Sequence, residues 1–375
     1  MILRSTGSTG IRSTSTLLAL PLIGALALGA CSTGPSGADA GSTGDNAGST
    51  SDGAGSTAGG AAGSEDTGEF PVTVDHAFGE TTIESDPQRV VTVGWTDHEI
   101  MAALGEVPVG AVKITWGGNA EGSTDWFDEA VRELGQDPAD ITRYDESDGI
   151  PVDEIAAMEP DLIIGTNSGI SQEDYDKLSA IAPTVAYPEQ PWSTPWRDSV
   201  ELVGEAIGRP DQASEAIADT EAAFEATKEA HPELEGTSFA WGWFTPTDTS
   251  TVGLYTVTDL RPQFLTELGM VNSPLVEELS TDGAFSANVS AEQADTIDAD
   301  VFIFYTEGDF GAEQVLADPL LSQISALQSG AYVASSDQQA ALGMSSPTPL
   351  SIPVALETFI PDVAEAAKTA QEAGR

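Results

Sequence analysis

Short apolar runs alternate with acid-started amphipathic segments through most of the chain. In the first half, four apolar runs have the length and composition of buried strands, and the segments between them carry helix start and stop signals. Strands that alternate with helices are typical of a parallel sheet covered on both faces. The predicted strands are 89–93, 109–114, 161–164 and 184–187, and the predicted helices are 96–105, 150–158 and 171–181.

The same alternation recurs in the second half, so the sequence predicts an α/β fold throughout. Two helix starts, Thr96–Glu99 and Ser290–Gln293, have the capping-box pattern, in which Ser or Thr is followed three residues later by Glu or Gln. Gly269 is placed to close a further helix. The predicted strands of this half are 239–244, 254–257 and 301–304, and the predicted helix is 261–268.

Residues 210–231 lie between the two halves and repeat apolar positions at helical spacing. A helix of about 20 residues spans roughly 30 Å, which is enough to cross from one lobe to another. The remaining chain is too long for one compact core and has the length of two lobes. We therefore predict an N-terminal lobe at 70–209, an interlobe helix at 210–232 and a C-terminal lobe at 233–375.

The two halves also share a local layout. Pro151–Ile164 and Val289–Ile303 each begin with a short acid-started helix and end in a buried strand. Each half therefore presents acids on the first turn of a helix, Asp153 and Glu154 in the first and Glu292 in the second. Acids at this position stabilise any helix through its dipole. The alternative is that they form a matched pair of contacts for a partner.

The first 30 residues have the pattern of a secretory signal. A basic segment with Arg4 and Arg12 precedes the apolar run Leu17–Ala30, and small residues lead to Cys31. A cysteine directly after the cut is typical of a bacterial lipoprotein signal, whose thiol takes a diacylglycerol. An ordinary signal beside a chance cysteine has the same pattern. We predict a signal peptide at 1–30, lipidation of Cys31 and a location on the extracytoplasmic face of the cell membrane.

Residues 31–69 have the composition of a linker. They are nearly all Gly, Ser, Thr, Ala and Asp, and no aromatic residue occurs between Ser32 and Gly68. A segment of this kind buries too little surface to offset the entropy of ordering. We predict a flexible tether, about 30–35 Å in average reach, between the lipid and the folded part.

The composition excludes several classes of function. The chain has 61 acidic and 13 basic residues, a net charge of −48, which disfavours nucleic acid as a partner. With Cys31 acylated no thiol is left for catalysis, and the three histidines lie far apart in no metal-binding spacing. No phosphate-binding loop, dinucleotide fingerprint or nucleophile elbow occurs. We therefore expect no enzyme, no cofactor and no metal site formed by the protein.

Several motifs in order resemble the ferric-siderophore and cobalamin class of ABC-transporter substrate-binding proteins. These are Pro87–Val91, Ala103–Gly105 with Pro108–Gly110, and Ile155–Ile164. Three further segments, Tyr175–Ser179, Ile181–Val185 and Thr194–Trp196, are similar to the iron-siderophore branch common in actinobacteria. The resemblance implies two α/β lobes joined by one long helix, as in class III periplasmic binding proteins, with ligand between the lobes and little closure on binding.

The resemblance also implies partners. The protein would be a monomer that binds an Fe(III)-siderophore and delivers it to an ABC permease dimer with its ATPase. One acid on each lobe would pair with permease arginines. In the C-terminal lobe this acid matches Glu292, whereas the N-terminal position falls on Asp153 with Glu154 beside it, which leaves the choice open. A haem or cobalamin receptor shares the fold and is the alternative. A manganese or zinc receptor is disfavoured, because the sequence lacks the cluster of metal ligands that such a receptor needs.

A ferric siderophore fills the coordination positions of iron with its own oxygens, so its receptor needs apolar surface and a few hydrogen-bond donors. Arg261 is the main donor candidate, although a surface ion pair is the alternative for it. Each tryptophan has core packing as its alternative, and His98 fits a plain helix position better than the cleft. The small number of basic residues favours a neutral or cationic hydroxamate over a trianionic catecholate. The predicted ligand-binding residues are Trp95, Trp116, Trp192, Trp196, Trp241, Trp243, Tyr255 and Arg261.

Overall fold

The computed structural model describes residues 68–281, 283–306 and 310–375. The predicted signal peptide, Cys31 and the predicted tether up to residue 67 lie outside these ranges. Within them, no helix is both long enough and apolar enough to cross a membrane.

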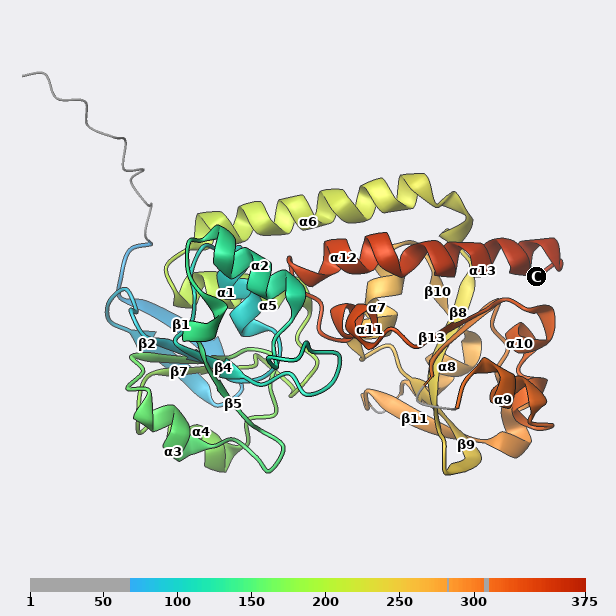
Figure 1. The fold of residues 1–375 in the computed structure, drawn as a ribbon, viewed down its shortest axis with the longest axis horizontal. Helices are drawn as coiled ribbons and strands as arrows, with labels where there is room; N and C mark the ends of the chain where they lie inside the picture. Colours follow the sequence, from blue (N-terminus) through green and yellow to red (C-terminus); the bar gives the residue numbers. More distant parts are fainter. Residues whose placement is uncertain (1–67, 282, 307–309) are drawn as a thin grey trace, which may run out of the picture. The chain divides into compact units, whose positions relative to one another are not determined.

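The first sheet is wholly parallel, as the sequence predicts. Its five strands lie in the order β5-β4-β3-β6-β7, and β3 pairs with β6 through Val91 and Ile163. The strands are short and largely buried because helices cover both faces (Figure 1). Their bounds are β3 Val90–Thr92, β4 Gly110–Val112, β5 Thr142–Tyr144, β6 Leu162–Gly165 and β7 Thr184–Ala186, and the helices are α1 Asp97–Ala103, α2 Asp125–Glu133, α3 Val152–Ala157, α4 Gln172–Leu178 and α5 Trp196–Ala206.

An antiparallel hairpin that the sequence pattern did not reveal precedes this sheet. It consists of β1 (Val72–His76) and β2 (Gly79–Ile83). Val74, His76, Thr81 and Ile83 are buried, whereas Asp75, Glu80 and Thr82 between them are exposed. Only a few apolar residues alternate with polar ones here, so the period-2 signal is weak.

The second sheet is mainly parallel, as predicted, and has an antiparallel edge that the sequence pattern did not indicate. Its order is β11-β9-β8-β12-β13, with β10 beside β8. β10, β12 and β13 are parallel to β8, whereas β9 and β11 form an antiparallel edge. β9 also begins earlier than predicted. Its first residues are polar, so the apolar pattern did not reveal them as part of a strand. The bounds are β8 Ser238–Thr245, β9 Asp248–Tyr255, β10 Val271–Asn272, β11 Ser286–Ser290, β12 Val301–Tyr305 and β13 Tyr332–Ser335.

Helices surround the second sheet and end the chain (Figure 1). They are α7 Leu260–Glu267, α8 Pro274–Leu279, α9 Ala312–Ala317, α10 Ser325–Ser329, α11 Gln338–Ser345, α12 Ser351–Thr358 and α13 Ile360–Glu372, with 3₁₀ turns η1 Pro138–Asp140, η2 Pro232–Leu234, η3 Ala291–Thr296 and η4 Leu321–Gln323.

The long helix α6 (Pro210–Ala230) lies where the interlobe helix is predicted. It runs along both lobes, with α12 and α13 beside it (Figure 1). Phe224 of α6 stacks on Trp196 of α5 at 6.4 Å and meets Phe264 of α7 edge-on at 5.1 Å between ring centroids. One helix therefore packs against elements of both lobes.

The C-terminal segment departs from the predicted division of the lobes. Leu342 of α11 is buried in the core of the N-terminal lobe, and Leu350 and Val354 pack against the same cluster. A second cluster runs without interruption from Val74 in the first hairpin to Phe359 near the chain end. Residues 342–354 therefore tie the C-terminal lobe to the first sheet.

Two of the predicted helix caps differ in the structure. Thr96 makes no capping hydrogen bond and has helical instead of extended backbone angles, and Glu99 turns into the interior instead of back to the helix start. Ser290 caps η3 through the amide of Glu292 at 3.4 Å, and the turn is 3₁₀ and not α-helical. By contrast, Ser171 and Asp174 form a complete capping box on α4.

Candidate functional site

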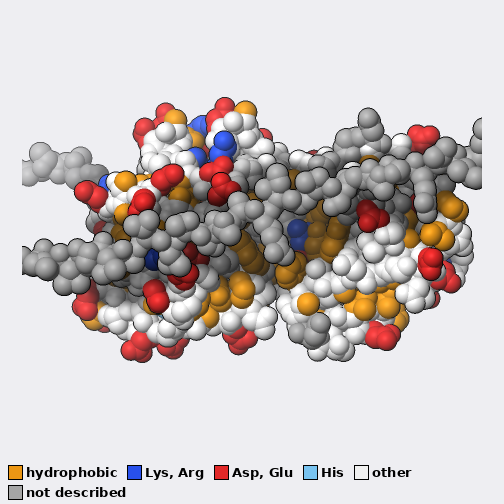
Figure 2. Space-filling view, turned by 90° about the horizontal axis from the view of Figure 1, so that it is seen from below, with side chains coloured by type: hydrophobic (Ala, Val, Ile, Leu, Met, Phe, Trp, Pro, Cys, Tyr) orange, Lys and Arg blue, Asp and Glu red, His pale blue; other side chains and the backbone are white. Residues whose placement is uncertain are grey.

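A cavity of 720 Å³ opens between the two lobes. Its walls come from loops that follow β3, β4 and β5 in the first lobe and from β8, β9, β12 and β13 with the segments after them in the second. Parallel strands present their carboxyl ends at one edge of a sheet, where α/β proteins bind ligand. Figure 2 shows hydrophobic side chains gathered in this region, with a basic side chain among them.

Six of the eight predicted ligand-binding residues line the cavity. Trp196 and Trp241 do not, and this part of the prediction is wrong. Trp196 is buried at the lobe junction and donates from Nε1 to Glu267 at 2.9 Å. Trp241 is fully buried in mid-strand, stacked on Phe359 at 5.7 Å. The six that line the cavity are Trp95, Trp116, Trp192, Trp243, Tyr255 and Arg261.

Trp243 lies flat across the neighbouring strand. It is opposite Gly253 of β9, where a Cβ atom would approach the indole to 2.1 Å. Its ring is 4.8 Å from that of Tyr255, and the guanidinium of Arg261 is 4.1 Å from the centre of the Tyr255 ring. Gly253 therefore leaves room for the indole, so that indole, phenol and guanidinium adjoin one another on the C-terminal wall.

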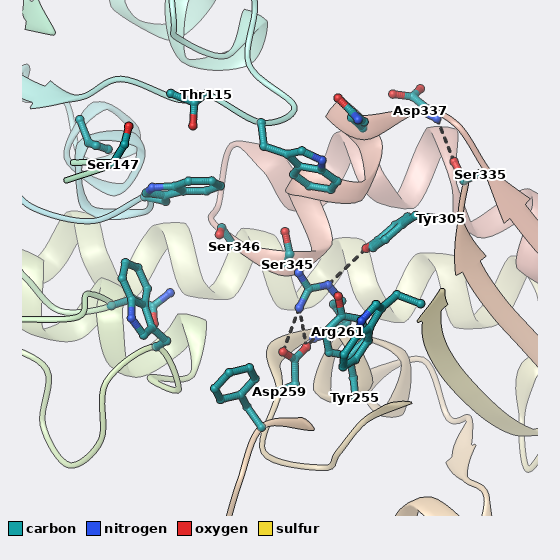
Figure 3. Close-up of a pocket in the computed structure, with 18 of the residues that line it drawn as sticks. Thr115, Ser147, Tyr255, Asp259, Arg261, Tyr305, Ser335, Asp337, Ser345 and Ser346 are labelled. Atoms are coloured by element: carbon teal, nitrogen blue, oxygen red, sulfur yellow. Dashed lines mark hydrogen bonds and ion pairs between the residues drawn. The ribbon is translucent and has the colours of Figure 1, made fainter. Parts of the chain in front are cut away.

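Arg261 is held by several partners and is not a loose surface ion pair. Nη1 donates to both carboxylate oxygens of Asp259 at 3.0 and 2.9 Å, and Nε donates to the Tyr305 hydroxyl at 3.2 Å (Figure 3). Its side chain is 17% exposed. Within the described part of the chain, the Nη2 group donates to no protein atom. A fixed guanidinium with free N–H groups is suited to bind ligand oxygens.

Tyr305 is the principal residue that the sequence analysis missed. It ends β12 and meets Trp116 edge-on at 5.7 Å between ring centroids. Burial raises the pKa of its phenol well above the usual range, so the hydroxyl stays neutral. Its position at the carboxyl end of a predicted strand was the available signal. Phe244, Phe285 and Phe310 add further aromatic surface.

Trp192 stands at the cavity with an unusual backbone conformation. Its φ is 60°, a region that residues other than glycine seldom adopt, and its side chain is 44% exposed. The indole packs on Gly169, where a Cβ atom would come within 2.7 Å of Nε1. Strained backbone of this kind is common at binding sites.

The N-terminal wall of the cavity carries polar side chains beside its tryptophans. It includes Lys113, Thr115, Asp145, Glu146 and Ser147. Ser147 donates from its backbone N–H to Asp145 at 2.8 Å and also through its hydroxyl. These hydrogen bonds, with a smaller contribution from Lys113, lower the pKa of Asp145. Thr115 and Ser147 lie across the cavity from Arg261 (Figure 3).

His98 is in the core and not at the cavity, in agreement with the plain helix position. It is fully buried, 4.8 Å from Phe127 between ring centroids. Burial, with the nearby Arg143, lowers the pKa of His98 well below its usual value. Glu99 is also buried and accepts hydrogen bonds from Thr124, Trp126 and Thr348. Both side chains support the wall from behind.

The acids singled out by the internal correspondence occupy equivalent places. Asp153 and Glu154 are exposed on α3, which precedes β6, and Glu292 is exposed on η3, which precedes β12. β6 pairs with β3, the first strand of its sheet in chain order, and β12 pairs in the same way with β8. None of the three acids lines the cavity.

No group of three His, Cys, Asp or Glu side chains in the described ranges is arranged to hold a metal ion. The cavity therefore offers aromatic rings, hydroxyls, one fixed guanidinium and several carboxylates. Such a lining can bind a bulky, partly apolar ligand through stacking and hydrogen bonds.

Known proteins with similar sequences and structures are consistent with this architecture. The crystal structure of PiaA from Streptococcus pneumoniae TIGR4 in complex with ferrichrome is 36% identical, covers 79% of this chain and 99% of its own, and has a TM-score of 0.74. A periplasmic solute binding protein from Mycobacterium smegmatis is 31% identical, covers 79% of this chain and 99% of its own, and has a TM-score of 0.67.

A curated relative matches a shorter region. The probable siderophore-binding lipoprotein YfiY of Bacillus subtilis is 36% identical over 148 residues, which are 39% of this chain and 42% of YfiY. The chain thus matches less than half the length of that relative. The family model described as periplasmic binding protein matches residues 90–338. Together with the two-lobed α/β fold, this match shows that the chain belongs to the periplasmic binding protein family.

Proposed function

We propose that this protein is the extracytoplasmic receptor of an ABC importer and that it binds an Fe(III)-siderophore in the cavity between its lobes. The observation that carries the proposal is the adjoining group of Trp243, Tyr255 and Arg261 in a cavity of 720 Å³ that Trp95 and Trp116 also line. Flat aromatic surface suits a bulky chelate, and the guanidinium suits its oxygens. The similarity to PiaA, which was crystallised in complex with ferrichrome, and to the probable siderophore-binding lipoprotein YfiY supports it.

The ligand class that fits best is a ferric hydroxamate. Three hydroxamates balance the charge of Fe(III), so the chelate core is neutral and needs no dense basic pocket. The described cavity residues include only two basic side chains, Lys113 and Arg261. A trianionic catecholate would face more acids than bases. Iron would arrive inside its ligand, so the receptor would act without a metal site or cofactor of its own and without catalysis.

The membrane attachment and the transport partner belong to the same proposal. Cys31 would carry the lipid after removal of residues 1–30, and residues 31–69 would tether a monomeric receptor to the outer face of the membrane. Glu292 and the pair Asp153 and Glu154 would contact arginines of the permease dimer. Their exposure and their equivalent places before β12 and β6 support this role.

Ligand titration tests the central claim. Purified protein should lose tryptophan fluorescence on addition of ferrichrome or ferrioxamine B, because several indoles line the cavity. A haem or cobalamin receptor would instead bind those ligands, and its absorbance spectrum would separate the two functions. Absence of binding to every ferric hydroxamate and catecholate in a panel would refute the proposal.

A further inference from the structure

The charged residues that line the cavity include more acids than bases, so that two carboxylates have no base beside them. Among the described lining residues are two bases, Lys113 and Arg261, and four acids. Arg261 is neutralised by Asp259 through a bidentate contact at 3.0 and 2.9 Å. The charge of Asp145 is stabilised by hydrogen bonds from Ser147 and by the positive charge of Lys113.

The two remaining acids are Asp337 and Glu146. Asp337 caps α11 by accepting from the amides of Gln339 and Ala340, each at 3.1 Å, so the helix start stabilises its charge. Glu146 has no basic partner. Its Oε1 atom is buried and accepts no hydrogen bond from the described residues. The groups that influence this carboxyl are the Gly94 amide, Tyr144 and Asp97, none of them a cation.

A carboxyl without a basic partner in the cavity lining indicates what a ligand would supply. A buried carboxylate without a cation is costly, and a positive group placed next to it would offset that cost. Burial, opposed by the Gly94 amide and Tyr144 and reinforced by Asp97, raises the pKa of Glu146 to about 7. The site therefore holds an acceptor on its N-terminal wall that is ready to ionise when a cation arrives.

The opposite wall has the complementary character. Arg261 presents its free N–H groups from the C-terminal side, across the cavity from the segment that contains Ser147 (Figure 3). A ligand with anionic oxygens at one end and a positive group at the other would match both walls. A ligand with anionic groups at both ends would place one of them against Glu146.

We propose that Glu146 is a specificity-determining residue that selects ferric chelates carrying an ammonium group, with the chelate oxygens toward Arg261 and the ammonium toward Glu146. This inference rests on the proposed siderophore function and adds the charge class and the orientation of the ligand. It assigns to Glu146 direct recognition of the ligand, which distinguishes it from the aromatic residues that bind any bulky chelate.

The test uses two ligands that differ only at the amine, ferrioxamine B and its N-acetylated derivative. Both are linear ferric trihydroxamates, and only the first has a free ammonium group. Wild-type protein should bind ferrioxamine B about tenfold more tightly than the acetylated form, the range of one charge-assisted hydrogen bond. Calorimetry or tryptophan quenching at pH 8 gives the ratio of the two dissociation constants.

Variants locate the source of that preference. Glu146→Gln keeps the shape of the side chain and should reduce the ratio to about one, whereas Glu146→Asp should retain part of it. The matched control is Glu173→Gln, which removes the same charge from an 80% exposed side chain on α4 that is not part of the cavity lining. It should leave the ratio as in the wild type, which separates local recognition from the overall negative charge of the protein.

The outcomes distinguish the inference from the function on which it rests. Equal binding of the two ligands by the wild type, or a preference that persists in Glu146→Gln, would overturn the role of Glu146 and leave siderophore binding intact. Failure of the wild type to bind either ligand, or any other ferric siderophore, would overturn both. The wild-type ratio is informative by itself, should a Glu146 variant not fold.

Discussion

Glu99 and Thr348 are separated by most of the chain, yet the Thr348 hydroxyl donates to Oε2 of Glu99 at 2.7 Å. Glu99 lies on α1 of the first lobe, and Thr348 lies between α11 and α12. The same carboxyl accepts from Thr124 at 2.8 Å and from Nε1 of Trp126 at 2.6 Å. This buried contact fastens the C-terminal segment, with the cavity residues Ser345 and Ser346, to the first lobe.

The Glu99 contact predicts a dependence of stability on pH. Burial raises the pKa of Glu99 to about 7, against the ordinary value of 4.5. The folded state therefore binds more protons than the unfolded state between these values, so the free energy of unfolding falls as pH rises through this range. Glu99→Gln resembles the protonated form. From pH 4 to pH 8, its stability relative to the wild type should increase by up to about 3 kcal/mol.

Denaturant unfolding at several pH values measures this difference. Glu173→Gln is again the control, since it removes a carboxylate from a side chain that is 80% exposed on the surface of α4. A wild type and a Glu99→Gln variant whose stabilities run parallel from pH 4 to pH 8 would show that the pKa of Glu99 does not change on folding.

The Arg261 contacts predict a loss of affinity when the guanidinium is removed. Arg261→Ala should weaken binding of ferric hydroxamates by about 1.5–3 kcal/mol, the range for a hydrogen bond to a charged group. Lys should restore only part, because it lacks the planar fork that contacts Asp259 and Tyr305 together. The double variant Arg261→Ala with Asp259→Ala removes the orphaned carboxylate. Wild-type affinity in both variants would exclude Arg261 as a ligand donor.

The tryptophans predict two distinct kinds of effect. Trp116→Ala should weaken ligand binding about tenfold while the fold is retained, because the residue lines the cavity and is only partly buried. Trp241→Phe should lower the melting temperature and leave affinity near wild type, because Trp241 is fully buried against Phe359. The opposite assignment of the two effects would mean that the cavity described is not the ligand site.

The Glu146 environment predicts a pH dependence of binding for cationic ligands. The groups facing this carboxyl are Asp97 on α1, Tyr144 on β5 and the Gly94 amide, and the pKa of Glu146 is about 7. The carboxyl is therefore mostly neutral at pH 6 and mostly ionised at pH 8. Affinity for ferrioxamine B should rise over this range, and affinity for its N-acetylated form should change little. Titrations at three pH values, with Glu146→Gln beside the wild type, check the difference.

Much of the fold could be predicted from the sequence because its inner strands are short apolar runs. Val90–Thr92, Leu162–Gly165 and Val301–Tyr305 lie where such runs occur. The antiparallel edge of the second sheet was missed because the first residues of β9 are polar and partly exposed. The first hairpin was missed for a similar reason. The alternation of apolar and polar residues reflects which side chains are buried. A strand that buries few side chains therefore has only a weak pattern in the sequence.

The candidate site was harder to predict because the sequence alone does not distinguish a tryptophan packed in the core from one that lines a cavity. Trp241 and Trp243 share one face of β8, yet only Trp243 is near the carboxyl end of the strand, where the cavity opens. Trp196 begins an amphipathic helix with Val200 and Val203 on the same buried face. That spacing favours core packing and was the available signal. The cross-lobe partners of Tyr305 and Glu99 depend on tertiary contacts that no local pattern contains.

The exposed acids on the two lobes predict a defect in transport that is separable from ligand binding. Glu292 lies on η3 and Asp153 with Glu154 on α3, at equivalent places in the two sheets and outside the cavity. Two weak contacts on one rigid body reinforce each other, and the lobes are joined by α6 and by the Glu99–Thr348 contact. Reversing the charge on one lobe should therefore abolish docking to a permease that presents arginines.

In cells, Glu292→Arg should stop uptake of the ferric ligand, while the purified variant keeps wild-type affinity and melting temperature. The N-terminal lobe should need Asp153→Arg together with Glu154→Arg, since either acid can meet the permease. Glu313→Arg, a charge reversal on α9 of the same lobe as Glu292, is the matched control and should transport normally, because Glu313 is likewise exposed but does not precede β12. Normal uptake by Glu292→Arg, or loss of ligand binding in solution, would leave these acids with the helix-dipole role alone.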